Sequence, residues 1–200
     1  MDTLADAPFR DARYAPRALE VERHGETLIL RNPMPYSDAV RTTTAPLARW
    51  AGQAPDRVWL AERIEGQDGW RTVTYGEAAA RVAALAGGLS ALGLSRGKPL
   101  LILARNGVDH ALIAYAAMSL GVPVAPVSPQ YGLLGADLSR LAQAVERIRP
   151  AAVYADDAAA FAGALDHDCL DGLPVIASRN PRPGDQPFEA LLASPPAADV

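Results

Sequence analysis

The stretch that decides the fold is Pro99–Pro129, which reads PLLILARNGVDHALIAYAAMSLGVPVAPVSP. It opens with the apolar run Leu100–Leu103, which is too short for a free-standing helix and typical of a strand covered on both faces. After a polar break, an apolar segment predicts a helix over about 107–120, ended by Gly121. Val122–Val127 predicts a second strand. Strand, helix and strand within roughly 30 residues indicate a βαβ crossover, which requires parallel strands and is almost always right-handed.

The chain after this unit repeats the alternation of strands and helices. A loop over 128–135 leads into a helix on which four apolar residues share one face: Leu138, Leu141, Val145 and Ile148. A strand over 151–155, a helix over 157–165 and a strand over 173–177 follow, and then a short helix over 187–193. Short strands that alternate with helices predict an α/β fold with a doubly wound, mostly parallel sheet and flanking helices.

Two β-hairpins are predicted before residue 75. Alternation of apolar and polar residues pairs 19–23 with 27–30 around a His-Gly turn, and it pairs 57–64 with 70–73 around a second turn. We expect both hairpins to lie at the edge of the sheet.

Two helices in this part of the chain have recognisable starts. Thr44 predicts the N-cap of a helix that has Pro46 in its first turn and runs to about Gln53. Thr74 and Glu77 have the spacing of a capping box, so a second helix should begin there and end at a glycine near residue 93.

Composition narrows the class of protein. A length of 200 residues is enough for a full core, and half of the residues are apolar. A formal charge of −4 argues against nucleic acid or an anionic membrane surface as the main partner. One cysteine, Cys169, excludes an intramolecular disulfide and fits a reducing compartment. No apolar run suggests a signal peptide or a membrane span, so we expect a cytoplasmic protein.

The residues by themselves show little catalytic chemistry. The sequence contains neither a G-x-x-x-x-G-K-[ST] loop nor a G-x-G-x-x-G turn after a strand. Gly87-Gly88 lies inside a helical pattern, which favours close helix packing. His110 is expected in a surface or capping role, and Asp166–Cys169 as a solvated helix end. No catalytic residue and no metal ligand is assigned. The loop around Gly132 follows a predicted strand, where open α/β sheets bind ligands, but the spacing by itself favours a plain connecting loop.

Several segments stand in an order found in one superfamily: APDRVWLAER at 54–63 and the long run at 70–131. In this order they resemble the N-terminal part of the AMP-forming acyl-CoA synthetases, which belong to the adenylate-forming enzymes together with luciferases and peptide-synthetase adenylation domains. Four segments are similar to bacterial feruloyl-CoA synthases: LRNPMPY at 30–36, PDRVWLAER at 55–63, HALIAYAAMSLGVPVAPVSPQY at 110–131 and VYADDAAAFAGAL at 153–165. The resemblance covers about 17–193 and implies the N-terminal subdomain of an acyl-CoA synthetase fold.

The resemblance implies a two-step reaction of an acid–thiol ligase. A carboxylate attacks the α-phosphorus of ATP to give an acyl-adenylate and pyrophosphate, and the thiolate of CoA then displaces AMP. Mg²⁺ would screen the phosphates. For ferulate or a related hydroxycinnamate, the acyl pocket would be apolar and aromatic with a few placed polar groups.

The chain departs from the family in what it lacks. Its sequence contains no Ser/Thr/Gly-rich phosphate loop, no later ribose-binding aspartate and no C-terminal lid with a catalytic lysine. In relatives the phosphate loop begins shortly after the point that corresponds to Asp199-Val200. We therefore expect a fragment of a longer enzyme, one that binds no cofactor tightly and is inactive alone.

Few of the family's site residues carry over. In several relatives the loop after the second strand of the βαβ unit lies near the CoA nucleotide, and this loop corresponds to Ser128, Gln130 and Tyr131 here. Some relatives have an arginine at the position of Gln130, and 155–165 contains no basic residue where others bind the CoA phosphate. A structural loop remains the alternative for these residues.

The expected organisation is a flexible segment over 1–17, the α/β subdomain over 18–193 and a linker over 194–200 toward the phosphate-loop region. We expect a small carboxylic acid, ATP and CoA as partners. A homodimer and an enoyl-CoA hydratase/lyase as pathway neighbour are further expectations. Two alternatives stay open: a ligase for another aryl or medium-chain acid, and a non-catalytic α/β binding module complete at 200 residues.

Overall fold

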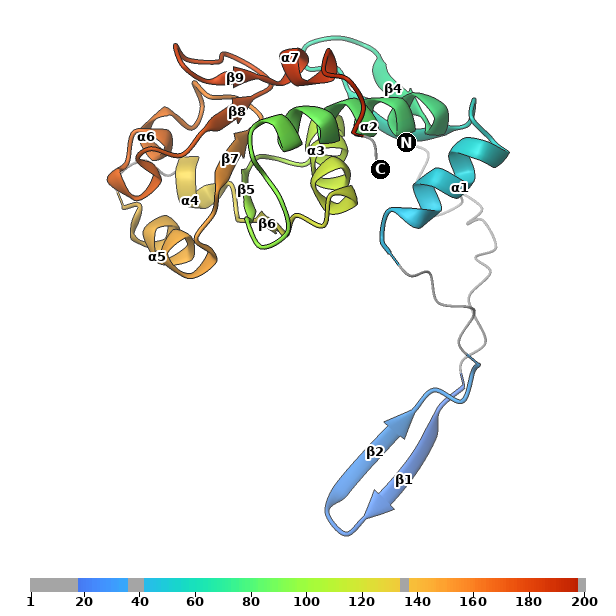
Figure 1. Ribbon diagram of the computed structural model, residues 1–200. Helices are drawn as coiled ribbons and strands as arrows, with labels where there is room; N and C mark the ends of the chain where they lie inside the picture. Colours follow the sequence, from blue (N-terminus) through green and yellow to red (C-terminus); the bar gives the residue numbers. More distant parts are fainter. Residues whose placement is uncertain (1–17, 36–41, 134–136, 198–200) are drawn as a thin grey trace, which may run out of the picture. The chain divides into compact units, whose positions relative to one another are not determined.

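A computed structural model describes residues 18–35, 42–133 and 137–197 (Figure 1). The chain forms two compact units, Met1–Ala39 and Val40–Val200, which are treated separately below. The flexible segment predicted over 1–17 lies outside the described residues.

The first unit contains one antiparallel hairpin, formed by β1 (Glu20–His24) and β2 (Thr27–Arg31). Its two strands pair as the sequence predicts. Because side chains alternate along each strand, one face of the hairpin is mostly apolar and the other mostly polar, with Arg23 on the first and Ile29 on the second. The apolar face carries exposed aliphatic side chains: Leu19, Val21, Leu28 and Leu30. On the polar face, Glu22 pairs with Arg31 and His24.

The second unit is built on a five-stranded parallel sheet with the order β6-β5-β7-β8-β9. Its strands are β5 (Leu100–Leu103), β6 (Val124–Pro126), β7 (Ala152–Ala155), β8 (Val175–Ala177) and β9 (Gln186–Pro187). The parallel pairing and the four predicted strands are confirmed. The sequence does not predict the fifth strand, β9, because two residues in a proline-rich stretch carry no periodicity.

Helices cover both faces of this sheet and create two apolar cores. One face is covered by α2 (Tyr75–Ala91), α3 (Val108–Ser119) and α7 (Phe188–Leu192), and α1 (Ala45–Gln53) packs on α2. The other packs against α4 (Gln130–Leu133), α5 (Ser139–Ile148), α6 (Ala162–Leu165) and the 3₁₀ turn Asp168–Leu170. In Figure 1, α2 and α3 lie on one side of the strands and α4, α5 and α6 on the other. All four β5 side chains are fully buried, which explains their unbroken apolar run.

The predicted helix signals at α2 and α3 are confirmed. The Thr74 hydroxyl accepts from the Glu77 N–H, while the Glu77 carboxylate accepts from the Thr74 N–H, which completes the capping box. Gly93 and Gly121 follow the ends of α2 and α3 with φ of 80° and 71°, left-handed values that glycine adopts without strain.

The second predicted hairpin forms, but its expected position at the sheet edge is wrong. β3 (Val58–Arg63) and β4 (Trp70–Thr74) form a separate two-stranded sheet with an irregular register between Val58 and Leu60. Side chains rather than ladder hydrogen bonds attach this hairpin to the rest of the unit: Glu62 and Arg71 contact α3.

Three further expectations are corrected. The helix expected over 157–165 shortens to α6, because the Asp157 carboxylate accepts the backbone N–H groups of Ala159 and Ala160 and holds a turn there. The strand expected over 122–127 shortens to β6, which Pro123 precedes and Pro126 ends, because a proline has no N–H to donate to the ladder. Thr44 makes no side-chain cap, since the hydroxyl of Thr42 accepts from the first helical N–H instead.

Candidate active site region

The order of the strands places a crevice at one edge of the sheet. From β5 the chain moves outward to β6, and it then returns to place β7 on the other side of β5. Open α/β sheets bind ligands at such a switch point, outside the carboxyl ends of the strands. The carboxyl ends of β5 and β7 are therefore the part of this fold with the strongest topological reason to bind a ligand.

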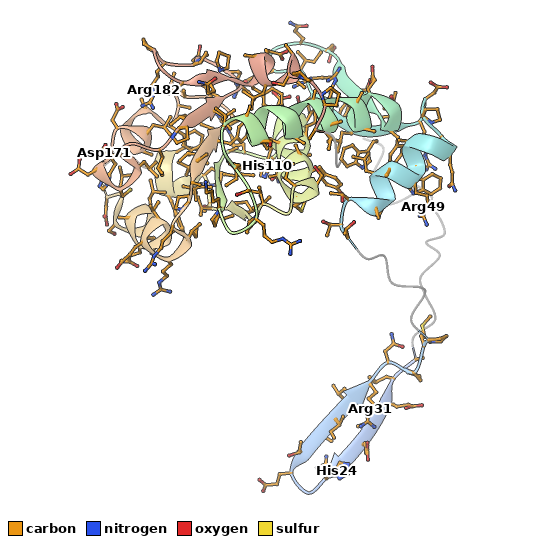
Figure 2. The ribbon with its side chains drawn as sticks, viewed as in Figure 1. His24, Arg31, Arg49, His110, Asp171 and Arg182 are labelled. Carbon is orange, nitrogen blue, oxygen red and sulfur yellow. The ribbon has the colours of Figure 1, made fainter. Side chains whose placement is uncertain are left out.

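A cavity of about 490 Å³ lies at this edge, and we call it the carboxyl-edge cleft. Residues that follow β5, β7 and β8, together with the β3–β4 hairpin, line it. The members used below are Arg105, His110, Tyr154, Asp156, Ser178 and Arg179. Figure 2 shows His110 at the beginning of α3.

Two arginines converge on one carboxylate in this cleft. Arg105 Nε lies 3.6 Å from Asp156 Oδ2, and Arg179 Nη2 lies 3.4 Å from the same oxygen. Both arginine side chains are about half exposed, so the ion pairs are screened and exchangeable. The other oxygen, Asp156 Oδ1, is buried and has no hydrogen-bond partner among the described residues. The cleft therefore offers donors and acceptors of nearly balanced charge, which suits a polar ligand that presents both.

The N-terminus of α3 is satisfied by protein groups. Glu62 Oε2 accepts from the Val108 N–H at 2.8 Å, and its Oε1 accepts from Arg71 at 3.0 Å. The other nitrogen of this guanidinium donates to Asp109. Burial lowers the pKa of Arg71, but the hydrogen bonds and charges of Asp109 and Glu62 outweigh it and raise that pKa. A Cβ on Gly107 would lie 2.9 Å from Glu62 Oε2, so this arrangement favours glycine there.

The Tyr154 hydroxyl lies on the inner wall of the cleft. It is 2.8 Å from Ser178 Oγ, and the residue is fully buried beside Phe188. Burial raises the pKa of Tyr154 above its ordinary value, and the bond to Ser178 lowers it by less. The hydroxyl therefore stays protonated at neutral pH and is paired with Ser178.

We expect Tyr154 to make the protein less stable above about pH 10, the ordinary tyrosine pKa. The unfolded chain releases this proton there while the folded chain retains it, so rising pH favours unfolding. Denaturant titrations between pH 8 and 11 measure the effect, with absorbance at 295 nm reporting tyrosinate. Tyr154→Phe should flatten the alkaline slope and cost about 1 kcal/mol at pH 7 for the lost hydrogen bond. An unchanged slope in the variant would contradict the assignment.

The three residues predicted near CoA lie elsewhere. Gln130 and Tyr131 belong to α4, a single helical turn that replaces the expected open loop, and the Tyr131 N–H donates to the Ser128 carbonyl at 3.0 Å. Ser128 and Gln130 are exposed, while Tyr131 packs against the second core. The structure brings these three together on one turn but does not place them among the residues that line the cleft.

The sequence did contain a signal for the cleft. Polar residues follow three of the predicted strands directly, at 105–106, 156–157 and 178–179, and parallel strands bring such positions to one edge.

The histidines make local contacts. His110 Nδ1 lies 3.1 Å from the Arg105 carbonyl oxygen, at the N-terminus of α3, close to the predicted capping role. His167 Nδ1 accepts from the Cys169 N–H. In the described ranges, no three histidine, cysteine or acidic side chains gather closely enough to hold a metal ion.

The chain is similar in sequence to one enzyme family and in fold to several solved structures. The family of AMP-binding enzymes matches residues 47–195. Among solved structures, acetoacetyl-CoA synthetase from Streptomyces lividans has a TM-score of 0.66 and 23% identity over 80% of this chain and 26% of that chain. Benzoate CoA ligase from Burkholderia xenovorans LB400 has a TM-score of 0.61 and 22% identity over 80% and 30% of the two chains.

A chain from Rhodopseudomonas palustris CGA009, described as a long-chain-fatty-acid CoA ligase, has a TM-score of 0.63 and 24% identity over 78% and 37%. At these identities the likeness shows a shared fold. The chain spans between 26% and 37% of the length of these solved structures. No curated protein matches it. Among helices of the described residues, none has the length and apolar composition needed to cross a bilayer.

Proposed function

The chain belongs to the AMP-binding enzyme family, and from that premise we propose that it is the N-terminal portion of an ATP-dependent, AMP-forming aryl-CoA ligase. The observation that carries this proposal is the family match over 47–195, which includes the whole parallel sheet. Support comes from the names of two structures with the same fold, an acetoacetyl-CoA synthetase and a benzoate CoA ligase.

In the proposed reaction, a carboxylate oxygen attacks the α-phosphorus of ATP, and the bond to pyrophosphate breaks. The CoA thiolate then attacks the acyl carbon, and AMP leaves. We assign no step of this chemistry to a side chain of the present chain. Because the described residues hold no cluster of three metal-ligating groups, we also assign no Mg²⁺ ligand to it.

We propose two places where substrates meet this subdomain. The first is the α4 turn, where Ser128 and Gln130 are exposed and free to contact the CoA nucleotide, with Tyr131 anchoring the turn in the core. The second is the carboxyl-edge cleft, whose position at the switch point is where this fold class binds ligands. The subdomain boundaries at 18 and 193 are part of the same proposal.

The proposed acid is ferulate or a related hydroxycinnamate, and the test is pyrophosphate release by the protein expressed from its natural reading frame. ATP, Mg²⁺, CoA and one acid are supplied, with ferulate, coumarate, caffeate, benzoate and octanoate compared. We expect ferulate or coumarate to give the highest rate. If benzoate or octanoate gives the highest rate, the proposed ligase activity stands and the proposed hydroxycinnamate substrate is wrong.

The matched control is Met1–Val200 alone, which we expect to form no CoA thioester. If this piece forms a CoA thioester, the prediction that it is inactive alone is wrong. No release with any acid from the natural reading frame would favour the non-catalytic binding module. The cytoplasmic location, the homodimer and the enoyl-CoA hydratase/lyase neighbour stay predictions.

A further inference from the structure

Two consecutive glycines interrupt α2 at Gly87 and Gly88, although glycine is the poorest helix former after proline. A pair of them within a 17-residue helix lowers the intrinsic preference of the segment for the helix. Close packing against these positions explains the pair, because every other side chain would occupy space that a neighbouring segment uses.

The neighbouring segment is Ser194–Ala197, which we call the strap. A Cβ on Gly87 would lie 1.9 Å from the carbonyl oxygen of Pro195 and 3.3 Å from the backbone nitrogen of Ala197. Real Cβ atoms do not approach backbone atoms to 1.9 Å, so alanine at this position forces the strap or the helix to move.

Gly88 has a different neighbour. A Cβ there would lie 2.8 Å from Leu191 Cγ and 3.0 Å from Ser194 Oγ. These atoms belong to side chains, of which the leucine is buried in the first core. Gly88 therefore permits the close approach of α2 and α7, whereas Gly87 faces the strap backbone itself.

A hydrogen bond fixes the strap on the same face of α2. The Ala197 N–H donates at 3.2 Å to the carbonyl oxygen of Ala83, one helical turn before Gly87. Ala197 also packs against the first core, while Pro195 and Pro196 are exposed. The strap is thus held at its end by one backbone bond and one apolar contact, and the missing side chain at Gly87 allows both.

We propose that Gly87 is a positioning residue: it seats the strap on α2 and so fixes the direction in which the chain leaves this subdomain. This inference rests on the proposed function, because direction matters only if the following residues take part in adenylation. A shift of about 1 Å in a group that positions substrate can cost about 100-fold in rate. The position of the strap on α2 is therefore expected to affect the rate of acyl-adenylate formation.

The test compares Gly87→Ala with wild type in the protein expressed from its natural reading frame. Hydrogen exchange of the two strap amides, those of Ser194 and Ala197, measures how firmly the strap is held, and ATP-dependent pyrophosphate release measures adenylation. We expect the strap amides to lose at least about 10-fold in protection and kcat to fall about 10-fold, with KM for the acid unchanged. The melting temperature should fall by only a few degrees, because the higher helix preference of alanine over glycine offsets part of the cost of displacing the strap.

Two variants serve as controls. Gly52→Ala lies in α1, where a Cβ would meet nothing within 4 Å, so strap exchange and kcat should both stay at wild-type values. Ala197→Pro removes the donated N–H while Gly87 stays intact; it also removes the amide that reports on the strap, so its readout is kcat, which should fall as in Gly87→Ala.

The outcomes separate the inference from the proposed function. If the strap amides of Gly87→Ala are as protected from exchange as those of wild type, Gly87 does not position the strap. A loosened strap with unchanged kcat and KM would overturn the positioning role while the ligase stands. No pyrophosphate release by the wild type with any acid would overturn the proposed function and with it the catalytic half of the inference.

Discussion

Replacing Phe161 by alanine is expected to lower the free energy of unfolding by about 3–5 kcal/mol, the range measured for buried aromatic truncations. Phe161 is fully buried in the second core, at the start of α6. Domains of this size have about 5–15 kcal/mol of stability in total, so the variant should be marginally folded at 25 °C. Urea denaturation followed by circular dichroism gives the difference.

The same substitution should loosen the α4 turn. The Phe161 ring lies against the buried Gly132, where a Cβ would stand 2.8 Å from Phe161 Cδ1. Removing the ring leaves a cavity beneath the turn that carries Ser128 and Gln130. We therefore expect faster hydrogen exchange over 128–133 in Phe161→Ala than in wild type, under conditions where both are folded.

Phe161→Leu is the matched control, because it keeps most of the buried apolar volume. It should cost roughly half as much as the alanine variant or less, with exchange over 128–133 near wild type. A loss below 1 kcal/mol in Phe161→Ala would show that the second core collapses around the site. In that case the α4 turn does not depend on this ring.

Replacing Arg71 by alanine is expected to cost about 2 kcal/mol, between the values for exposed ion pairs and for fully buried ones. The substitution leaves the carboxylates of Glu62 and Asp109 close together at the N-terminus of α3 without a cation. The Arg71 side chain is 36% exposed, so water reduces the penalty below that of a buried charge. Thermal and urea denaturation at low and high salt measure the loss.

Arg63→Ala on the neighbouring strand is the matched control. Its guanidinium lies over the exposed Trp70 ring, 4.8 Å from the centroid, and the described residues give it no ion pair. We expect a loss of less than about 1 kcal/mol. In a double-mutant cycle, Glu62→Gln should recover part of the cost of Arg71→Ala, because it removes one of the repelling charges. Equal losses in Arg63→Ala and Arg71→Ala, or a purely additive cycle, would contradict the network.

The candidate site was predicted only in part. The sequence predicted ligand contacts in the loop after β6, at the carboxyl edge of a parallel sheet, and these contacts stay a prediction. That loop follows an edge strand, whereas the switch point lies between β5 and β7. Which strands are neighbours depends on the crossing from β6 to β7, and no local pattern records it. The sequence therefore did not reveal the order of the strands in the sheet, and the position of the cleft depends on that order.

The sequence by itself determined the elements whose signals are local. Short apolar runs predicted the buried strands, and the capping box of Thr74 and Glu77 predicted the start of α2. Glycines, which have positive φ in the structure, predicted the helix ends. These signals act within a few residues, so the surrounding fold did not change them. Where a polar side chain competed for backbone donors, as at Asp157, even the local prediction failed.

The tertiary structure alone decided which distant residues come into contact. Arg71 and Asp109 are 38 residues apart, and Gly87 meets Pro195 across more than half of the chain. Such pairs depend on which helix covers which face and on how closely two backbones approach. These quantities follow from the packing of all the elements together, since each contact must offset the entropy of bringing distant segments to one place.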